Sequence, residues 1–209
     1  MALIVRCTKG PGKGECKIED SDLILMIQQG KRDAFNQLFE KYKDEAVRTA
    51  FLVTGRRSIC EDIAQEAFIQ CYMHINDLQN PSGFRAWFYR ILTRTAWKYG
   101  RSAGREIPTE NMTEKAEESS EDLADEQYLA SEKNRILYSE IDRLNSKLKA
   151  VIVLYYFNGF STKEIAKISG CLEGTVKSRL FTARKRLKAG MDSFYSGKEC
   201  SFNAEHKAI

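Results

Sequence analysis

Apolar side chains recur at intervals of three and four residues along most of this chain, which is the pattern of amphipathic helices. Gly30 interrupts the first stretch, and Gly55 and Gly100 follow the second and the last. We therefore expect one helical domain in the first half of the chain. Its predicted helices cover about 22–42, 45–54, 58–75 and 84–99.

The same spacing returns in the second half of the chain, where Leu137, Ile141, Leu144 and Leu148 form one apolar stripe. Residues 151–157 are apolar nearly all round and continue the helical period, so we interpret them as a buried helix rather than a strand.

The chain has only 3 prolines and 13 glycines among 209 residues, which favours long helices over a fold rich in turns. The predicted fold class is all-α, with two small helical domains joined by a flexible acidic linker. The predicted boundaries are a flexible N-terminal tail at 1–19, a first domain at 20–103, the linker at 104–130, a second domain at 131–194 and a C-terminal tail at 195–209.

The most specific local signal is a helix-turn-helix between Ser161 and Lys188. Ser161 and Glu164 have the spacing of a capping box, which starts a helix at Thr162. Gly170 can take the left-handed conformation that a tight turn needs. A second helix then begins near Gly174 and is expected to end at about Lys188.

The second helix of this motif has two different faces. Its predicted buried stripe contains Val176, Leu180, Ala183 and Leu187. Short polar and basic side chains near a helix start fit a DNA major groove. The opposite face therefore predicts DNA binding; it carries Lys177, Ser178, Phe181, Thr182, Lys185 and Arg186.

Charge is distributed unevenly, although the net charge is only +4. No acidic residue occurs at 78–105 or at 174–188, whereas 106–126 holds nine acidic residues and one lysine. Two basic blocks around an acidic one suggest two nucleic-acid surfaces. In the first block, aromatic residues alternate with Arg90, Arg94, Lys98 and Arg101, a combination that suits unpaired bases, and Trp87 is interpreted as a core residue.

Metal sites, membrane spans and catalytic clusters find no support in the sequence. The six cysteines and two histidines lack metal-ligand spacing, and Cys60, Cys71 and Cys171 sit in apolar patterns as small core residues. No apolar run approaches the roughly 20 residues that span a bilayer, and the first residues are too short for a signal-peptide core. We expect a cytoplasmic protein without cofactor or metal.

Three segments together resemble the extracytoplasmic-function (ECF) sigma factors of the sigma-70 family. They are DIAQEAF at 62–68, FRAWFYRI at 84–91, and EIA at 164–166 with EGTVKSRL at 173–180. The resemblance covers about 20–102 and 131–190. It implies that the first domain, region 2, binds core RNA polymerase and melts the −10 promoter element, and that the second, region 4, reads the −35 element.

The resemblance also implies which residues make each contact. The polymerase contact falls on Asp62, Gln65, Glu66 and Ile69. The −10 contact falls on Asn80, Ser82, Phe84, Arg85, Tyr89, Arg90, Arg94, Trp97, Lys98 and Arg101. The −35 contact falls on Thr175, Lys177, Ser178, Arg179, Phe181, Thr182, Arg184 and Lys185.

The implied partners are the beta and beta-prime subunits of RNA polymerase, promoter DNA, and an anti-sigma protein anchored in the membrane. This chain departs from the family pattern at Arg94, Lys98 and Thr182, where Asn, Asp and Arg are common. These differences concern promoter preference.

Two other functions compete with this interpretation. A stand-alone helix-turn-helix regulator would use the same C-terminal motif, but it would not need the helix of alternating aromatic and basic residues. An enzyme such as a nuclease would need a carboxylate or histidine cluster, and both basic blocks lack acidic residues altogether.

Overall fold

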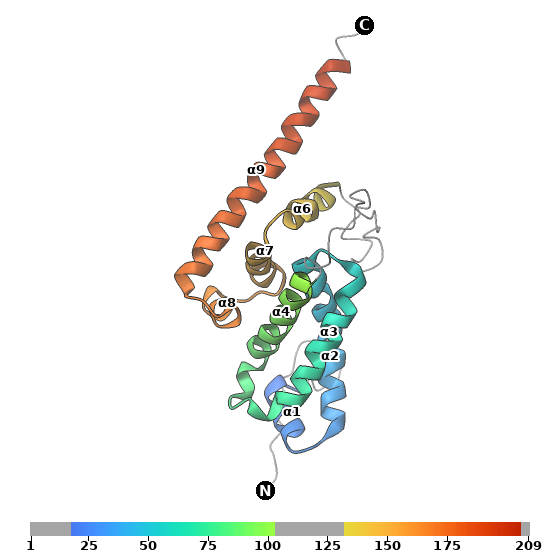
Figure 1. The fold of residues 1–209 in the computed structure, drawn as a ribbon, viewed down its shortest axis with the longest axis vertical. Coiled ribbons are helices and arrows are strands. Elements are labelled where there is room, and N and C mark those ends of the chain that lie inside the picture. Colours follow the sequence, from blue (N-terminus) through green and yellow to red (C-terminus); the bar gives the residue numbers. More distant parts are fainter. Residues whose placement is uncertain (1–17, 103–131, 206–209) are drawn as a thin grey trace.

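The computed structural model describes residues 18–102 and 132–205, and every element within these two ranges is helical (Figure 1). The all-α fold class is therefore confirmed. The first range contains α1 (Asp20–Gln28), α2 (Arg32–Thr54), α3 (Cys60–His74) and α4 (Phe84–Ser102), with short 3₁₀ turns at Arg57–Ile59, Ile75–Asp77 and Pro81–Gly83. The second contains α6 (Glu132–Asp142), α7 (Ser146–Ile152), the π-helical segment η4 (Val153–Phe157), α8 (Thr162–Ser169) and α9 (Glu173–Glu205).

The predicted linker and almost all of the predicted N-terminal tail lie outside the described residues. In the described part of the chain, no helix is long and apolar enough to span a membrane.

The N-terminal bundle is built on aromatic packing among α2, α3 and α4. Phe88 is fully buried, with its ring centroid 4.8 Å from that of Phe68 and 5.8 Å from that of Phe84. Tyr42 reaches the same cluster from α2, at 5.6 Å from Phe84. The expected break between 42 and 45 is absent: α2 is one continuous helix that ends at Gly55, whose φ of 70° provides a left-handed cap.

The C-terminal bundle contains the predicted helix-turn-helix. The Ser161 hydroxyl accepts a hydrogen bond from the Glu164 backbone amide, and the Glu164 carboxylate accepts one from the Ser161 backbone amide. The capping box is therefore complete. Gly170 has a φ of 62° and closes α8 in the left-handed conformation. Val176 is fully buried and packs α9 onto α8, as predicted.

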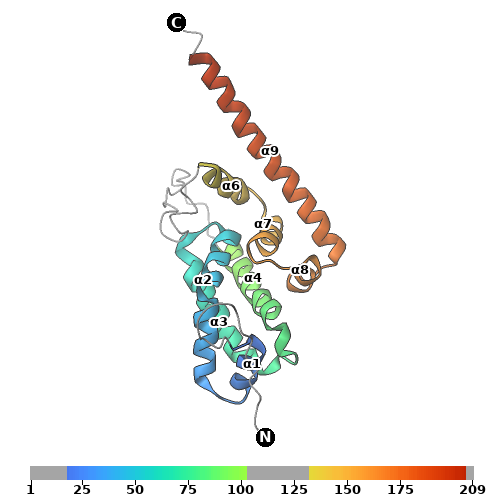
Figure 2. The ribbon, with the colours of Figure 1, turned by 180° about the vertical axis from the view of Figure 1, so that it is seen from behind.

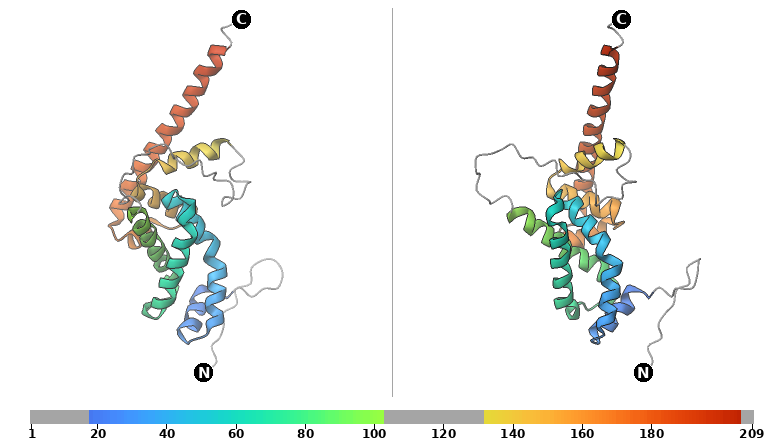
Figure 3. Two further views of the ribbon diagram at one scale, coloured as in Figure 1. Left: turned by 45° about the vertical axis from the view of Figure 1, so that its right-hand side comes forward. Right: turned by 90° about the vertical axis from the view of Figure 1, so that its right-hand side faces the viewer.

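Two expectations about this half need correction. Residues 151–157 form a helix, as expected, but Tyr156 and Phe157 at its end are 56% and 37% exposed. The segment is therefore buried on one side only. The second helix of the motif also runs well past Lys188, to Glu205, because no proline follows and Gly190 is tolerated within the helix. Figures 1 and 3 show this end of α9 projecting beyond the bundle.

The two bundles pack directly against each other. Helix α8 packs against α4, and α7 and η4 contact α2 (Figures 1 and 2). One continuous set of buried apolar residues runs through both halves, from Leu23 to Ala183. The sequence predicted two domains joined by a linker, and it did not predict this shared core.

Candidate nucleic-acid interface

The start of α9 presents the residues predicted to read DNA. Phe181 is 70% exposed, and the Lys177 side chain is 65% exposed. The Lys177 ammonium lies 2.9 Å from a Glu173 carboxylate oxygen, which also accepts a hydrogen bond from the Thr162 hydroxyl. These two donors lower the pKa of Glu173 below its ordinary value. Any anion that binds Lys177 would therefore compete with Glu173.

Other predicted −35 residues are placed differently around α9. Ser178 and Lys185 are exposed, and Thr175 and Thr182 are half-buried. The Thr182 hydroxyl donates to the Ser178 carbonyl. Arg179 is also half-buried and lies 3.7 Å from the Cys171 sulfur.

Arg184, another predicted −35 residue, turns away from the face predicted to read DNA. Its Nε donates to the Tyr156 hydroxyl at 2.8 Å, and its guanidinium lies over the Tyr155 and Tyr156 rings at 5.6 and 5.5 Å. The side chain therefore joins the rim of an apolar groove of about 520 Å³ on the C-terminal bundle. Its apolar lining consists of Leu137, Ile141, Ile152, Phe157, Leu187 and Met191.

The N-terminal bundle carries a basic ridge on α4. Arg90, Arg94 and Lys98 are exposed and four residues apart, so they lie on one face of the helix. The side chain of Arg101, the next predicted member, lies outside the described residues. Trp97 is half-buried, and its ring nitrogen has no hydrogen-bond partner within the described chain.

Beside this ridge, α3 and α4 enclose a groove of about 400 Å³ that the sequence did not predict. Trp87, Arg94 and Lys98 line it from α4, and Gln70 and His74 line it from α3. The prediction that Trp87 is a core residue is therefore only half right, because its ring is half-buried and faces this groove. Trp87 lies seven residues before Arg94 and eleven before Lys98, and this helical spacing indicates that the three side chains share one side of α4.

The loop before α4 keeps its predicted polar residues accessible. Asn80 and Ser82 are exposed, and the Asn80 side chain accepts a hydrogen bond from the Ser82 amide. Two other predicted −10 residues are buried. Phe84 belongs to the aromatic core, and Tyr89 is covered by the C-terminal bundle through Phe160, at a centroid distance of 5.0 Å.

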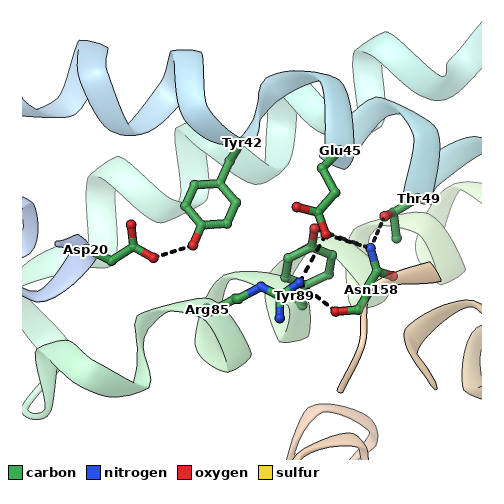
Figure 4. A network of polar contacts seen from close by, with 7 residues as sticks. All are labelled: Asp20, Tyr42, Glu45, Thr49, Arg85, Tyr89 and Asn158. Carbon is green, nitrogen blue, oxygen red and sulfur yellow. Dashed lines mark hydrogen bonds and ion pairs between the residues drawn. The ribbon is translucent and has the colours of Figure 1, made fainter. Parts of the chain in front are cut away.

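Arg85, also a predicted −10 residue, is engaged by other residues of the protein (Figure 4). Its Nη2 atom donates to the Asn158 carbonyl at 2.6 Å and to a Glu45 carboxylate oxygen at 3.1 Å. Its guanidinium lies over the Phe160 ring, 4.4 Å from the centroid. The Asn158 side-chain amide donates to the same Glu45 oxygen at 3.0 Å and to the Thr49 hydroxyl at 2.9 Å. The structure therefore places Arg85 in the interface between the two bundles.

A third surface lies on α3, where polymerase contacts were predicted. Asp62, Gln65 and Ile69 are exposed, whereas Glu66 is half-buried and accepts a hydrogen bond from Gln70. Gln65 and Ile69 border an apolar groove of about 400 Å³. Its other lining residues, which sequence reasoning did not assign to a contact, are Phe35, Phe39, Phe68, Tyr72 and Met73.

The cysteines of the core are poor nucleophiles. Cys60 and Cys71 are fully buried, as predicted, and burial raises the pKa of their thiols to about 11 and about 12. Cys171 is half-buried. Within 18–102 and 132–205, no group of three or more histidine, cysteine or carboxylate side chains could hold a metal ion.

Comparison with known proteins places both bundles in one family. The model of Sigma-70 region 2 matches residues 38–106, and that of Sigma-70, region 4, matches residues 134–187. The stand-alone regulator is not favoured, because the N-terminal bundle has its own sigma-factor match.

Relatives match along most of their length. The ECF RNA polymerase sigma-E factor of Haemophilus influenzae is 33% identical, over 82% of this chain and 95% of the relative. That of Escherichia coli K12 is 30% identical, over 82% and 93%. The RNA polymerase sigma-H factor of Pseudomonas aeruginosa is 30% identical, over 81% and 92%.

Solved structures show the same fold. CnrH in complex with the cytosolic domain of CnrY has a TM-score of 0.61 at 22% identity, over 83% of this chain and 97% of that chain. The sigma factor RpoE in complex with the anti-sigma factor NepR, from Bartonella quintana, has a TM-score of 0.59 at 24% identity, over 76% and 96%. On the sequence relatives and both family models, this chain belongs to the ECF sigma factors of the sigma-70 family.

Proposed function

We propose that this chain acts as the promoter-recognition subunit of RNA polymerase and directs transcription initiation from promoters with dedicated −10 and −35 elements. The observation that carries the proposal is the presence of two separate exposed basic surfaces. One is the α4 ridge of Arg90, Arg94 and Lys98, and the other is the first half of α9 with Lys177, Lys185 and Arg186. Both act by binding, and the chain needs no catalytic group of its own.

The groove between α3 and α4 suits the unpaired strand of the −10 element. The half-buried Trp87 ring offers a stacking surface, and Arg94 and Lys98 at the same groove neutralise phosphates. The opposite wall carries Gln70 and His74, which hydrogen-bond to the Glu66 and Asp77 carboxylates at the same groove, so a base edge would compete with these two carboxylates. The loop with Asn80 and Ser82 lies immediately before α4 and can hold an extruded base.

The start of α9 suits the −35 element in its double-stranded form. Lys177, Ser178 and Phe181 are exposed within its first three turns, where a recognition helix meets base edges. Lys185 is exposed two turns beyond Lys177, which supports a contact with phosphates.

The apolar groove beside Gln65 and Ile69 suits a protein partner, because an exposed apolar patch with a polar rim is typical of protein interfaces. We assign it to core RNA polymerase. The groove on the C-terminal bundle, with Arg184 and Lys188 at its rim, would take an amphipathic helix with acidic flanks.

We further propose that an anti-sigma protein holds this factor inactive, as an anti-sigma partner is bound to the solved relative RpoE of Bartonella quintana. The chain itself is expected to act in the cytoplasm, and a membrane anchor would belong to the partner. A screen for gene deletions that raise activity of the target promoter tests this. Finding no such gene would indicate control by expression.

Run-off transcription tests the main proposal. Core RNA polymerase with this chain should produce discrete transcripts from a few genomic fragments, and core enzyme alone should not. A chain with Lys177→Ala and Arg94→Ala serves as the matched control, because both side chains are exposed and their loss should spare the fold. Equal transcription with and without the chain would reject the proposal.

A further inference from the structure

One acidic residue borders the face of α9 that is predicted to read DNA. Glu173 is the first residue of α9 and directly precedes the stretch 174–188, which contains no acidic residue. A carboxylate repels phosphates, so its presence here lowers the affinity for DNA of any sequence. A negative charge in the first turn also stabilises a helix through its dipole, but that effect requires no contact with other side chains. Glu173 makes two such contacts.

The Glu173 carboxylate joins the two helices of the helix-turn-helix through one oxygen atom. Its Oε1 atom accepts a hydrogen bond from the hydroxyl of Thr162, the first residue of α8, at 2.8 Å. The same atom lies 2.9 Å from the ammonium of Lys177, one turn further along α9. Glu173 therefore holds the Lys177 side chain close to the start of the helix.

Both members of this ion pair remain accessible to a ligand. The Lys177 side chain is 65% exposed, and the Glu173 side chain is 32% exposed. An ammonium has more than one N–H group and a carboxylate can accept about four hydrogen bonds, so each group can bind a ligand without leaving the other. The pair presents a donor and an acceptor side by side on the helix that is proposed to enter the major groove.

This arrangement suits the edge of a base pair better than it suits a phosphate. A phosphate is only an acceptor, so it would compete with Glu173 for Lys177 and be repelled by the carboxylate. In the major groove, guanine presents the O6 and N7 acceptors, and the cytosine paired with it presents the N4 amino donor. Lys177 can therefore donate to guanine while Glu173 accepts from cytosine.

The same arrangement distinguishes the four base pairs. A keto base at Lys177 and an amino base at Glu173 satisfy both groups, which occurs in G·C and, with fewer acceptors for the ammonium, in T·A. The pairs A·T and C·G place an amino group against the ammonium and a keto oxygen against the carboxylate. Such unpaired and repelling groups are the means by which an interface rejects the wrong partner.

We propose that Glu173 is a specificity-determining residue of the −35 contact. Its carboxylate accepts a hydrogen bond from the amino group of the base opposite the one that Lys177 contacts, and it excludes base pairs that present a keto oxygen there. The preferred pair is G·C, with guanine at Lys177. This proposal rests on the proposed function and deepens it by assigning one −35 base pair to the two residues together.

Two variants of Glu173 test the proposal in the holoenzyme formed with core polymerase. Glu173→Ala removes the carboxylate. Glu173→Gln keeps an oxygen that can accept from Thr162, and its amide can donate to a keto oxygen. The matched control is Glu40→Ala, which removes the same charge from another exposed pair with a lysine of the same helix, Lys43 on α2. Unchanged helical circular dichroism shows that each variant folds.

Titration of fluorescein-labelled promoter duplexes, with each base pair at each −35 position, measures the preference. Lys177→Ala identifies the position that the pair contacts. Wild type and Glu40→Ala should favour G·C there, whereas both Glu173 variants should lose about tenfold of the discrimination against A·T and C·G. Preferences at the other positions should be unchanged. Binding of an unrelated duplex by Glu173→Ala should become tighter, because a repelling charge is removed.

Three outcomes would count against the proposal. An equal loss of affinity for all sequences in Glu173→Ala would mean that the carboxylate only joins α8 to α9. Unchanged discrimination in both Glu173 variants, at the position where Lys177→Ala relaxes it, would overturn the proposal and leave the proposed function standing. A wild-type holoenzyme without preference at any −35 position would reject the proposed function, and this proposal with it.

Discussion

The Lys149 ammonium lies 2.5 Å from an Asp142 carboxylate oxygen, and only 6% of the Lys149 side chain is exposed whereas 61% of the Asp142 side chain is. The pair sits at the end of α2, where a Cβ added at Gly55 would collide with the Asp142 carboxylate. Gly55 therefore caps α2 and, because it has no side chain, leaves room for the Asp142–Lys149 ion pair of the other bundle. A cation at the carbonyl end of a helix is also favoured by the helix dipole.

Replacing Asp142 with alanine should lower the free energy of unfolding by about 1–2 kcal/mol, because a buried ammonium loses its charged partner while water still reaches the site. Urea denaturation of the full chain measures this. Glu40→Ala is the control, since it breaks the exposed pair with Lys43 and should cost less than about 0.5 kcal/mol. Equal losses in free energy of unfolding for the two variants would show that the Asp142–Lys149 pair stabilises the fold no more than an exposed ion pair does.

The capping box of α8 should make stability depend on pH. Hydrogen bonds from the Ser161 hydroxyl and amide lower the pKa of Glu164 below its ordinary value of 4.5. A lowered pKa stabilises the fold above the ordinary value, and the contribution disappears as the pH falls through the lowered one. The advantage of wild type over Glu164→Gln should therefore be present at pH 7 and disappear only as the pH falls below 4.5 and through the lowered pKa.

The Ser161 hydroxyl is the other half of the same capping box. Ser161→Ala should cost about 1 kcal/mol at pH 7, and Ser161→Thr should restore most of it because it keeps the hydroxyl. Urea unfolding at pH 7 measures both, and unfolding at several pH values follows Glu164. A constant difference between wild type and Glu164→Gln across this range would contradict the assignment.

The helix-turn-helix could be predicted because its signals are local. Ser161, Glu164, Gly170 and Val176 act within 16 residues of one another, and each has a backbone or packing reason to be where it is. The sequence therefore predicted the turn and most of the buried stripe, whose last predicted member, Leu187, is instead half-buried at the groove of the C-terminal bundle. The same locality explains the correct expectation that Cys60 and Cys71 belong to the core.

The interface between the two bundles could not be predicted because its partners are distant in the sequence. Asn158 and Glu45 are 113 positions apart, and nothing near either residue signals the other. The orientation of Trp87 was missed for a related reason. Helical spacing places Trp87 on the same side of α4 as Arg94 and Lys98, but the groove on that side exists only because of where α3 packs against α4.

The apolar groove on α2 and α3 should be required for polymerase binding. Met73 is 66% exposed and lines the groove, so Met73→Glu should spare the fold and place a charge inside the interface. We expect affinity for core polymerase to fall about tenfold, or about 1.4 kcal/mol. The control is Gln37→Glu, an exposed position of α2 that does not line the groove. Titration of labelled chain with core enzyme measures both variants, and equal affinities would place the docking surface elsewhere.

Trp87 should contribute to binding of the unpaired −10 strand. Removing one stacking ring typically costs about 1–3 kcal/mol, so Trp87→Ala should weaken strand binding by the holoenzyme to that extent. Trp87→Phe keeps a ring and should recover most of the affinity. Thermal unfolding of both variants shows whether the loss reflects the fold instead. Normal strand binding by a folded Trp87→Ala would remove this groove from the proposed interface.

Substitutions of two lysines of α9 should have different effects, because we expect Lys177 to contact base edges and Lys185 to contact phosphates. Lys177 lies one turn into α9 and is held by Glu173 at 2.9 Å. Lys177→Ala in the holoenzyme should cost about 1–3 kcal/mol at one −35 position and relax preference there. Lys185→Ala should weaken binding to all sequences and reduce the salt slope by about one unit. Thr182→Arg adds a cation and should raise affinity with little change in preference. Titrations against a panel of −35 variants at several salt concentrations separate these outcomes. The same sequence-independent loss for both lysines would make this face of α9 an electrostatic anchor, and the reading of bases would have to be assigned to other residues.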